Sequence, residues 1–248
     1  MTDGYYTVDD FVPGTLDAHL SGLNRQLNEG VVMRENRGNL PYPGDIKYKD
    51  LNGDGMINEG NETLDDPGDK KVIGNTNRRY QFGLNAYATY KDFDFSFALN
   101  GVGKRDLPLK GDLIWGYQGQ FDHIYKHQLD YWTPDNRDAK YPRMYGSNGV
   151  GSNYGESRKV QTKYLSNGAY LRIKNITLGY SLPQTLLTKL NIEKLRLFVA
   201  GDNLFTFDDL PKGVDPDYTR AGSDKPYTTN SGAYPIMRSF SFGLNVTF

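Results

Sequence analysis

The sequence predicts an all-β fold in which antiparallel strands form part of a large transmembrane β-barrel with long extracellular loops. Three observations lead to this prediction. Several segments alternate apolar and polar side chains over about 9 to 11 residues, the length that a tilted strand needs to cross a bilayer. The connections between these segments are alternately short and very long. The 248 residues include Tyr 19, Phe 12 and Gly 28, which favours pleated surfaces, membrane interfaces and turns.

The clearest predicted element is a β-hairpin. Residues 82–90 alternate apolar side chains, such as Phe82 and Leu84, with polar or small ones. A tight turn at 91–92 follows, and residues 93–100 repeat the alternation. This period of two predicts paired strands with one apolar face. The aromatic residues near the turn are typical of an interfacial girdle.

Three further strands are predicted downstream. The first lies within 168–183 and changes phase, which indicates a bulge near Lys174-Asn175. The second lies within 193–207, and one or two helical turns beginning at Pro183 precede it. The third runs from near Tyr234 to the end of the chain. With the hairpin, these segments give about five crossing strands.

The connections differ strongly in length. Those at 91–92 and 181–193 are short, whereas 104–167 and 208–233 are long and rich in Gly, Pro, Asn, Asp and Tyr. Outer-membrane barrels combine short periplasmic turns with long extracellular loops. We therefore predict an extracellular loop region at 1–77, and barrel strands with their loops at 78–248.

Two loop helices are also predicted. The first lies at 15–30, where apolar residues form one helical stripe behind a Thr15 cap. The stripe consists of Leu16, Leu20, Leu23 and Leu27. The second lies at 121–134 and stops before Pro134.

Composition excludes several classes of protein. The formal net charge is -1, from Lys+Arg 29 and Asp+Glu 30, so there is no basic field to attract nucleic acid. With Cys 0, the chain has neither disulfides nor thiolate metal sites. No segment approaches the roughly 18 apolar residues of a membrane-spanning helix, and the start shows no secretion-signal pattern.

The sharpest local motif is DLNGDGMINEGNE at 50–62. Its acidic and amide residues stand at positions one, three and five of an EF-hand-type calcium loop, and Gly55 stands at the sharp turn. At position twelve Asn61 replaces the expected bidentate Glu, and a Glu follows one residue later. We predict a structural calcium ion; an acidic turn without metal is the alternative. The predicted ligands are Asp50, Asn52, Asp54, Met56, Asn58 and Glu62.

The sequence does not indicate an enzyme. It contains no nucleophile elbow and no Ser-His-Asp grouping, and nothing selects one pair of carboxylates for glycoside hydrolysis. Substrate-binding residues are not indicated either. Aromatic side chains in the long loop would suit stacking on sugars, docking of a partner or packing into a small core. They are Trp115, Tyr117, Tyr131, Trp132, Tyr141 and Tyr145.

Several segments together resemble the C-terminal portion of SusC/RagA-type TonB-dependent outer-membrane transporters of Bacteroidetes. They occur in order between Gly44 and Phe248, and residues before Gly44 are less distinctive. The segments are GDIKYKDLNGDGMIN, IGNTNRRYQFGLNAYATYKDFDFSFALNGVG, DYWTPDN, YLRIKNITLGYSLP, LRLFVAGDNLFTF, GVDPDY and YPIMRSFSFGLNVTF.

The resemblance implies a barrel of about 22 strands in the bacterial outer membrane, with a plugged lumen. It implies uptake of oligosaccharides (glycans) or of peptides. It also implies a SusD-like surface lipoprotein that closes over the transporter as a lid. Energy would come from the TonB complex, contacted through an N-terminal part upstream of Met1. The last strand resembles the assembly signal of outer-membrane barrels. The residues of this signal are Phe240, Phe242, Leu244, Val246 and Phe248.

About five strands cannot close a barrel, because the smallest known barrels use about eight. We therefore expect a fragment of a longer transporter, a truncated gene or one polypeptide of a split transporter. Two other functions stay open. One is a calcium-stabilised soluble β-domain that binds carbohydrate at the cell surface, and the other is a passive porin fragment.

Overall fold

The computed structural model describes residues 1–20, 24–35, 40–108, 115, 124–144, 157, 159–188, 191–212, 214–217 and 236–248. The chain divides into two compact units. The first consists mainly of Met1–Gly74 and Pro108–Leu165, and the second mainly of Asn75–Leu107, Ser166–Pro226 and Ala233–Phe248.

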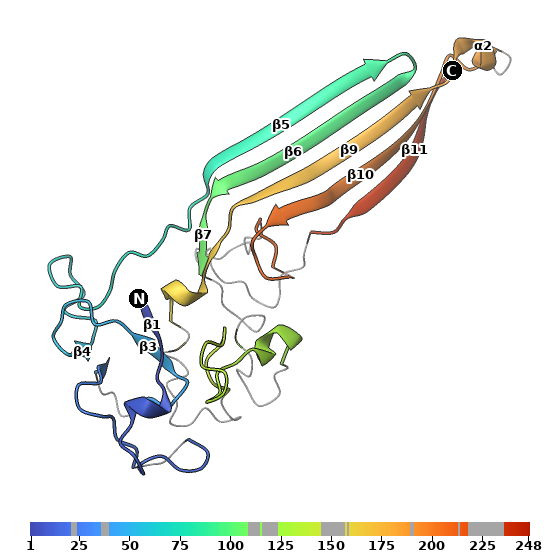
Figure 1. The fold of residues 1–248 in the computed structure, drawn as a ribbon. Helices are drawn as coiled ribbons and strands as arrows, with labels where there is room; N and C mark the ends of the chain where they lie inside the picture. The colour runs from blue at the N-terminus through green and yellow to red at the C-terminus, as the bar shows by residue number, and fades with distance from the viewer. Residues whose placement is uncertain are drawn as a thin grey trace. The chain divides into compact units, whose positions relative to one another are not determined.

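The second unit contains one five-stranded antiparallel sheet (Figure 1). The order of the strands in space is β11-β10-β9-β6-β5, so β6 and β9 are neighbours although a long segment separates them in sequence. This confirms the all-β prediction. The sheet is open in this chain, with β5 and β11 at its edges. The strands are β5 (Arg79–Tyr90), β6 (Phe93–Lys104), β9 (Tyr170–Ser181), β10 (Lys194–Asp208) and β11 (Ser239–Thr247).

The register confirms the hairpin and the bulge. β5 and β6 pair up to Tyr90 and Phe93, and Lys91 between them has φ 54, the left-handed conformation of a tight hairpin turn. In the pairing of β6 with β9, Ala98 and Leu99 face Asn175 and Ile173. Lys174 is therefore the extra residue of a bulge.

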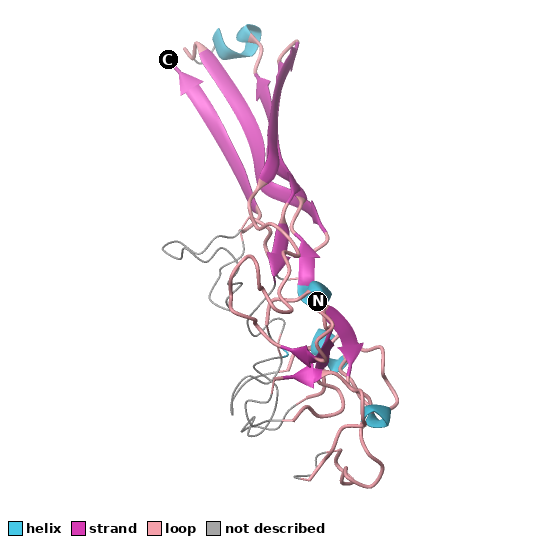
Figure 2. Ribbon diagram, turned by 90° about the vertical axis from the view of Figure 1, so that its left-hand side faces the viewer, coloured by secondary structure: helices cyan, strands magenta, loops and turns pink. Residues whose placement is uncertain are grey.

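The two ends of the sheet differ. The hairpin turn and the short helix α2 (Gln184–Leu187), which follows Pro183, lie at the same end (Figure 1). The connections from β6 to β9 and from β10 to β11 cover residues 105–169 and 209–238. In Figure 2 the sheet of the second unit is made of long strands, and helix is scarce. Among the described residues, no helix is both long and apolar enough to cross a membrane.

The described residues of the first unit form short elements. β1 pairs with β3 in antiparallel fashion, and β2 pairs with β4 in parallel. β7 and β8, whose residues lie mainly in the second unit, form a further two-stranded sheet. The strands are β1 (Thr2–Tyr5), β2 (Met33–Arg34), β3 (Ile46–Tyr48), β4 (Met56–Ile57), β7 (Asp106–Pro108) and β8 (Leu165–Asn167), and the 3-10 turns are η1 (Val8–Asp10), η2 (Lys126–Leu129) and η3 (Thr162–Tyr164).

Buried aromatic side chains hold the first unit together. The Tyr5 hydroxyl donates to the Ala139 carbonyl at 2.9 Å, and the ring of Tyr164 packs edge-on against Trp115 at 4.5 Å. Gly44 has φ +89, and a Cβ there would lie 2.5 Å from the Trp132 ring. Only glycine therefore fits between this backbone and the aromatic core.

The predicted helix at 15–30 is wrong for its described residues, which contain no helix. The Asp17 carboxylate accepts the His19 amide at 2.9 Å and closes a turn. Leu27 forms a β-bridge with Phe11. These contacts replace the expected helical stripe. The second predicted helix is reduced to η2, and 121–123 lie outside the described residues.

Candidate functional site

One face of the five-stranded sheet is apolar. Because alternate residues of paired strands point the same way, the register aligns Phe95, Leu178, Val199 and Phe242 in one row across β6, β9, β10 and β11. Leu178 is 51% exposed and Phe242 79% exposed. We call this surface the apolar face. It consists of Phe82, Leu84, Tyr90, Phe93, Phe95, Phe97, Leu99, Leu171, Ile173, Ile176, Leu178, Tyr180, Leu195, Leu197, Val199, Phe205, Phe207, Phe240, Phe242, Leu244 and Val246.

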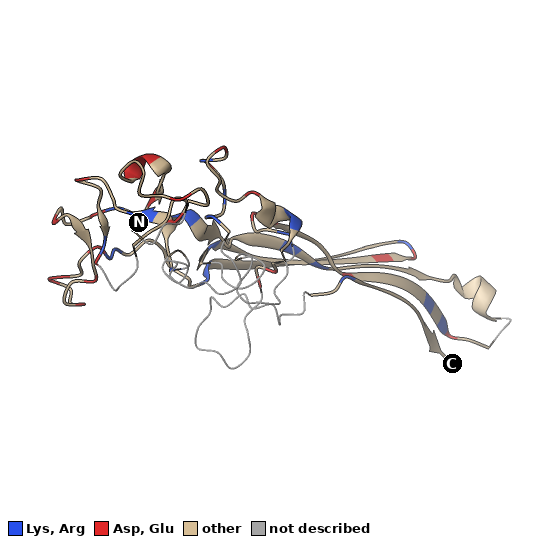
Figure 3. Ribbon diagram, turned by 90° about the horizontal axis from the view of Figure 1, so that it is seen from below, with Lys and Arg blue, Asp and Glu red and all other residues tan. Residues whose placement is uncertain are grey.

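The opposite face carries amides, hydroxyls and paired charges. Asn175 donates to Asp202 at 2.7 Å, and Thr177 donates to Asn175 at 2.9 Å. The strands are mostly tan in Figure 3, which marks charged residues in blue and red. We call this surface the polar face. It includes Asn85, Tyr87, Thr89, Asp94, Ser96, Asn100, Arg172, Asn175, Thr177, Arg196, Asp202, Thr206, Ser239, Ser241 and Asn245.

An ion pair on the polar face spans a whole strand. Asp94 lies in β6 and Arg196 in β10, and β9 runs between them. The Arg196 Nε donates to Asp94 Oδ1 at 2.7 Å. The side chains meet above Gly179 of β9, where a Cβ would lie 2.5 Å from Arg196 Nη2. Glycine at this position therefore allows the pair to form.

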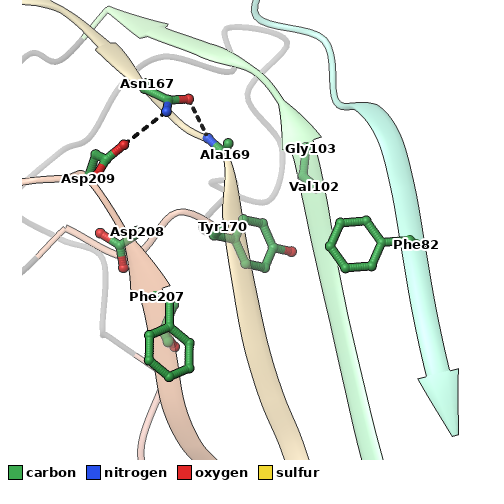
Figure 4. Close-up of a pocket in the computed structure, with 10 residues that line it drawn as sticks. Phe82, Val102, Gly103, Asn167, Ala169, Tyr170, Phe207, Asp208 and Asp209 are labelled. Atoms are coloured by element: carbon green, nitrogen blue, oxygen red, sulfur yellow. Dashed lines mark hydrogen bonds between the residues drawn. The ribbon is translucent and has the colours of Figure 1, made fainter.

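A shallow hollow of about 590 Å³ lies where the strands meet the long connections. Figure 4 shows Phe82, Tyr170 and Phe207 around it. Asn167 donates to Asp209 at 3.0 Å on one side of the hollow. The lining thus combines aromatic rings with amide and carboxylate groups.

The calcium-type loop brings several of its predicted ligands together. Asn52 and Asn58 donate to Asp54 Oδ2 at 2.9 and 3.1 Å. The Asp50 carboxylate accepts the amides of Gly53 and Gly55 at 2.6 and 2.8 Å. The amide oxygens and main-chain carbonyls of such a loop are the hard ligands that calcium prefers.

The hydrogen bonds of this loop favour the ionised form of Asp54. The backbone amide of Met56 lowers the pKa of Asp54 below its usual range, and Asn52 adds to this effect. Among the described residues, no three His, Asp or Glu side chains form a metal-binding group. A cation here would therefore depend on amide and carbonyl oxygens as well as on Asp50 and Asp54.

Asp69 is a residue of this loop that the sequence analysis missed. Its carboxylate accepts the Leu51 amide at 2.6 Å and the Asn58 amide at 2.8 Å, so it joins the two ends of the loop. No spacing rule points to it, because the motif ends at 62. The Glu62 carboxylate, in contrast, pairs with Lys70 at 2.9 Å.

A second carboxylate ties the loop to the rest of the first unit. Glu59 lies 3.2 Å from Lys159, 3.3 Å from Arg34 and 3.5 Å from Lys70. Lys159 is the main reason that the pKa of Glu59 falls to about 2. Glu59 therefore stays ionised at neutral pH and joins segments far apart in the sequence.

The aromatic residues of the long loop are largely buried. Trp115, Trp132 and Tyr141 are each at most 4% exposed, and Tyr131 is partly exposed. Trp115, Trp132 and Tyr141 therefore belong to a small buried core. Tyr117 and Tyr145 lie outside the described residues.

Similar proteins point to one family. A protein named TonB-dependent receptor P3, from Formosa agariphila, is 29% identical over 211 residues, which are 83% of this chain and 19% of that protein. TonB-dependent receptor SusC from Bacteroides thetaiotaomicron is 25% identical over 206 residues, 81% of this chain and 17% of that protein. The chain is a homologue of the TonB-dependent receptors. This confirms the resemblance to the SusC/RagA-type transporters.

The TonB-dependent receptor homologue spans about a fifth of the length of the curated relatives that it matches. No family model matches the chain. Its fold is similar to that of a chain in a structure described as the RagAB peptide importer in the 'closed-closed' state. The TM-score is 0.53, with 19% identity over 100% of this chain and 22% of that chain.

Proposed function

We propose that this TonB-dependent receptor homologue forms an arc of the wall of a SusC/RagA-type outer-membrane transporter. The observation that supports the proposal best is the division of one sheet into an apolar face and a polar face. Lipid would cover the apolar face, and an enclosed passage would lie against the polar face.

The exposure of the apolar face favours this function over a soluble carbohydrate-binding domain. A soluble β-sandwich buries such rows against a second sheet, whereas Leu178 and Phe242 are exposed here. Contiguous apolar patches of this kind mark membrane or protein contacts. The open edges at β5 and β11 require further strands, because unpaired backbone groups are costly in lipid. The greater length of the relatives is consistent with this requirement.

Import of oligosaccharides or peptides at the bacterial outer membrane is the transport function that we propose. The complete protein would act with a SusD-like lipoprotein and take its energy from the TonB complex. The names of the relatives support this assignment: one is SusC, and a protein of similar fold is described as a peptide importer. The chain would supply wall and loop surfaces, and it would carry out no catalytic step.

We also propose that the last strand acts as a barrel-assembly signal. Phe240, Phe242 and Leu244 lie in β11 on the apolar face and are 61–79% exposed. Val246 shares this face, and Phe248 follows the strand and is 85% exposed. Exposed rows of this kind are available to an assembly machine before lipid covers them.

Transport is tested by uptake. Cells that lack the transporter containing this chain should lose growth on one class of glycan or peptide and regain it on complementation. A glycan panel and a peptide panel supplied as sole nutrients separate the two substrate classes. The proposal would be contradicted if the deletion strain grew on every compound as well as the parent strain does, and if the two strains took up each compound equally in direct competition.

For the motif at 50–62 we propose a bound structural calcium ion. Calorimetric titration of the full chain with calcium should give a measurable heat of binding. Asp54→Ala should lower the calcium affinity at least about tenfold, because a charged ligand is lost. Asp65→Ala is the matched control, since it removes one exposed carboxylate from the neighbouring loop. Equal heats for the native chain and Asp54→Ala would rule out this site.

A further inference from the structure

A segment of the second unit, 215–217, is held by three arginines from different elements. Arg172 in β9 lies 2.6 Å from the Asp215 carboxylate. Arg78, which precedes β5, donates to the Asp217 carbonyl at 2.9 Å and lies 3.1 Å from its carboxylate. Arg105, which follows β6, donates to the Pro216 carbonyl at 3.0 Å. One strand of the sheet and two residues that flank other strands thus converge on one short segment.

Two of the three arginines are buried, and the Arg78–Asp217 contact is partly exposed. Arg105 and Arg172 are each 2% exposed, and the Asp215 side chain is 10% exposed. A guanidinium removed from water is strongly destabilising unless charged or polar partners surround it. The segment supplies such partners. Its docking is therefore coupled to the formation of the sheet.

The segment lies over the polar face. Arg172 faces Asn100 of β6 and Thr206 of β10 in the register, and its Nε donates to the Thr206 hydroxyl at 2.9 Å. Because Arg172 reaches Asp215 from this face, the segment covers the end of the sheet where the long connections begin. The motif GVDPDY at 213–218, noted in the sequence, includes this segment.

We propose that residues 215–217 form a fixed ledge that covers the loop end of the polar face. If the polar face lines a passage, which rests on the proposed function, the ledge narrows that passage at its loop end. Solutes would then meet the ledge before the buried Arg172 and Thr206. The three arginines hold the ledge in place.

The ledge is tested by thiol labelling, because the chain contains no cysteine of its own that would react. Val214→Cys places a single reporter beside the ledge in the full chain in detergent. Its reaction with a maleimide should become about tenfold faster or more with Arg172→Gln, because the broken pair leaves a buried carboxylate without its partner. Asp215→Asn should have a similar effect. Arg196→Gln is the matched control, because it breaks an ion pair of the same face at the other end.

Three outcomes would overturn the ledge. The first is an unchanged labelling rate in Arg172→Gln, and the second is an equal acceleration in Arg196→Gln. The third is full additivity of the two effects on the labelling rate in the Arg172→Gln/Asp215→Asn double variant, because substitutions at the two ends of one contact should have non-additive effects. Circular dichroism verifies that the sheet persists in each variant. The labelling needs no membrane or transport, so its failure is distinct from failure of the proposed function.

Discussion

Replacement of Ile176 by arginine is expected to prevent assembly of the protein in the outer membrane, whereas arginine at the adjacent Thr177 is tolerated. Ile176 lies in the central row of the apolar face, level with Phe97 of β6 and Gly201 of β10. An arginine facing lipid near the bilayer midplane costs about 2–4 kcal/mol in a transmembrane barrel. Thr177 belongs to the polar face, where an arginine could remain hydrated.

The measurement is the amount of folded protein in the outer-membrane fraction of cells that produce the complete transporter. Ile176→Arg should lower this amount strongly, and Thr177→Arg should leave it close to that of the parent. Ile176→Val controls for altered packing, because it keeps an apolar side chain. Equal recovery of the two arginine variants would mean that lipid does not cover the apolar face.

Alanine at Gly179 is expected to destabilise the sheet by about 1 kcal/mol, because the added Cβ meets the ends of flexible side chains and displaces one partly exposed ion pair. A Cβ at this position would lie 2.5 Å from Arg196 Nη2 and would also collide with Asp94. The clashing atoms are the ends of flexible side chains, so the two side chains would separate. Their separation breaks a contact that joins β6 to β10 across β9.

Gly83→Ala is the matched control. Gly83 lies in β5 of the same sheet, and a Cβ there would lie 3.5 Å from the Leu99 carbonyl oxygen, an ordinary contact. The free energy of unfolding, measured with urea in detergent micelles, should fall for Gly179→Ala and hardly change for Gly83→Ala. Arg196→Ala should reduce the penalty of Gly179→Ala, since it removes the clash with the guanidinium and frees the Asp94 side chain to move. A purely additive double variant would contradict this explanation.

The five strands of the sheet could be predicted because one face of each is apolar. Alternation with a period of two identified the hairpin at 82–100. A change of phase in the strand within 168–183 predicted the bulge near Lys174-Asn175, which the register confirms. The helix expected at 15–30 could not be corrected from sequence. Its leucine stripe is compatible with a helix, but Leu27 pairs with Phe11, and Arg25 stacks on the Tyr42 ring at 3.6 Å.

The site could be predicted only in part. Asp50, Asn52, Asp54 and Asn58 follow a local spacing, and hydrogen bonds link Asp54 to both asparagines. Asp69 follows no such spacing, because it lies outside the motif at 50–62 and meets Leu51 and Asn58 only through the fold of the loop. The Asp94–Arg196 pair joins residues 102 apart in sequence, and no local pattern predicts such a contact.

The sequence by itself determined the strands, their two-sided character and the resemblance to the SusC/RagA-type transporters, because these depend on local periodicity and on motifs in a fixed order. Only the tertiary structure decided which strands are neighbours, that Gly179 lies under an ion pair and that three arginines hold residues 215–217. These features depend on contacts between distant segments. Their formation requires the register of the whole sheet, which pairs β6 with β9 across more than a quarter of the chain.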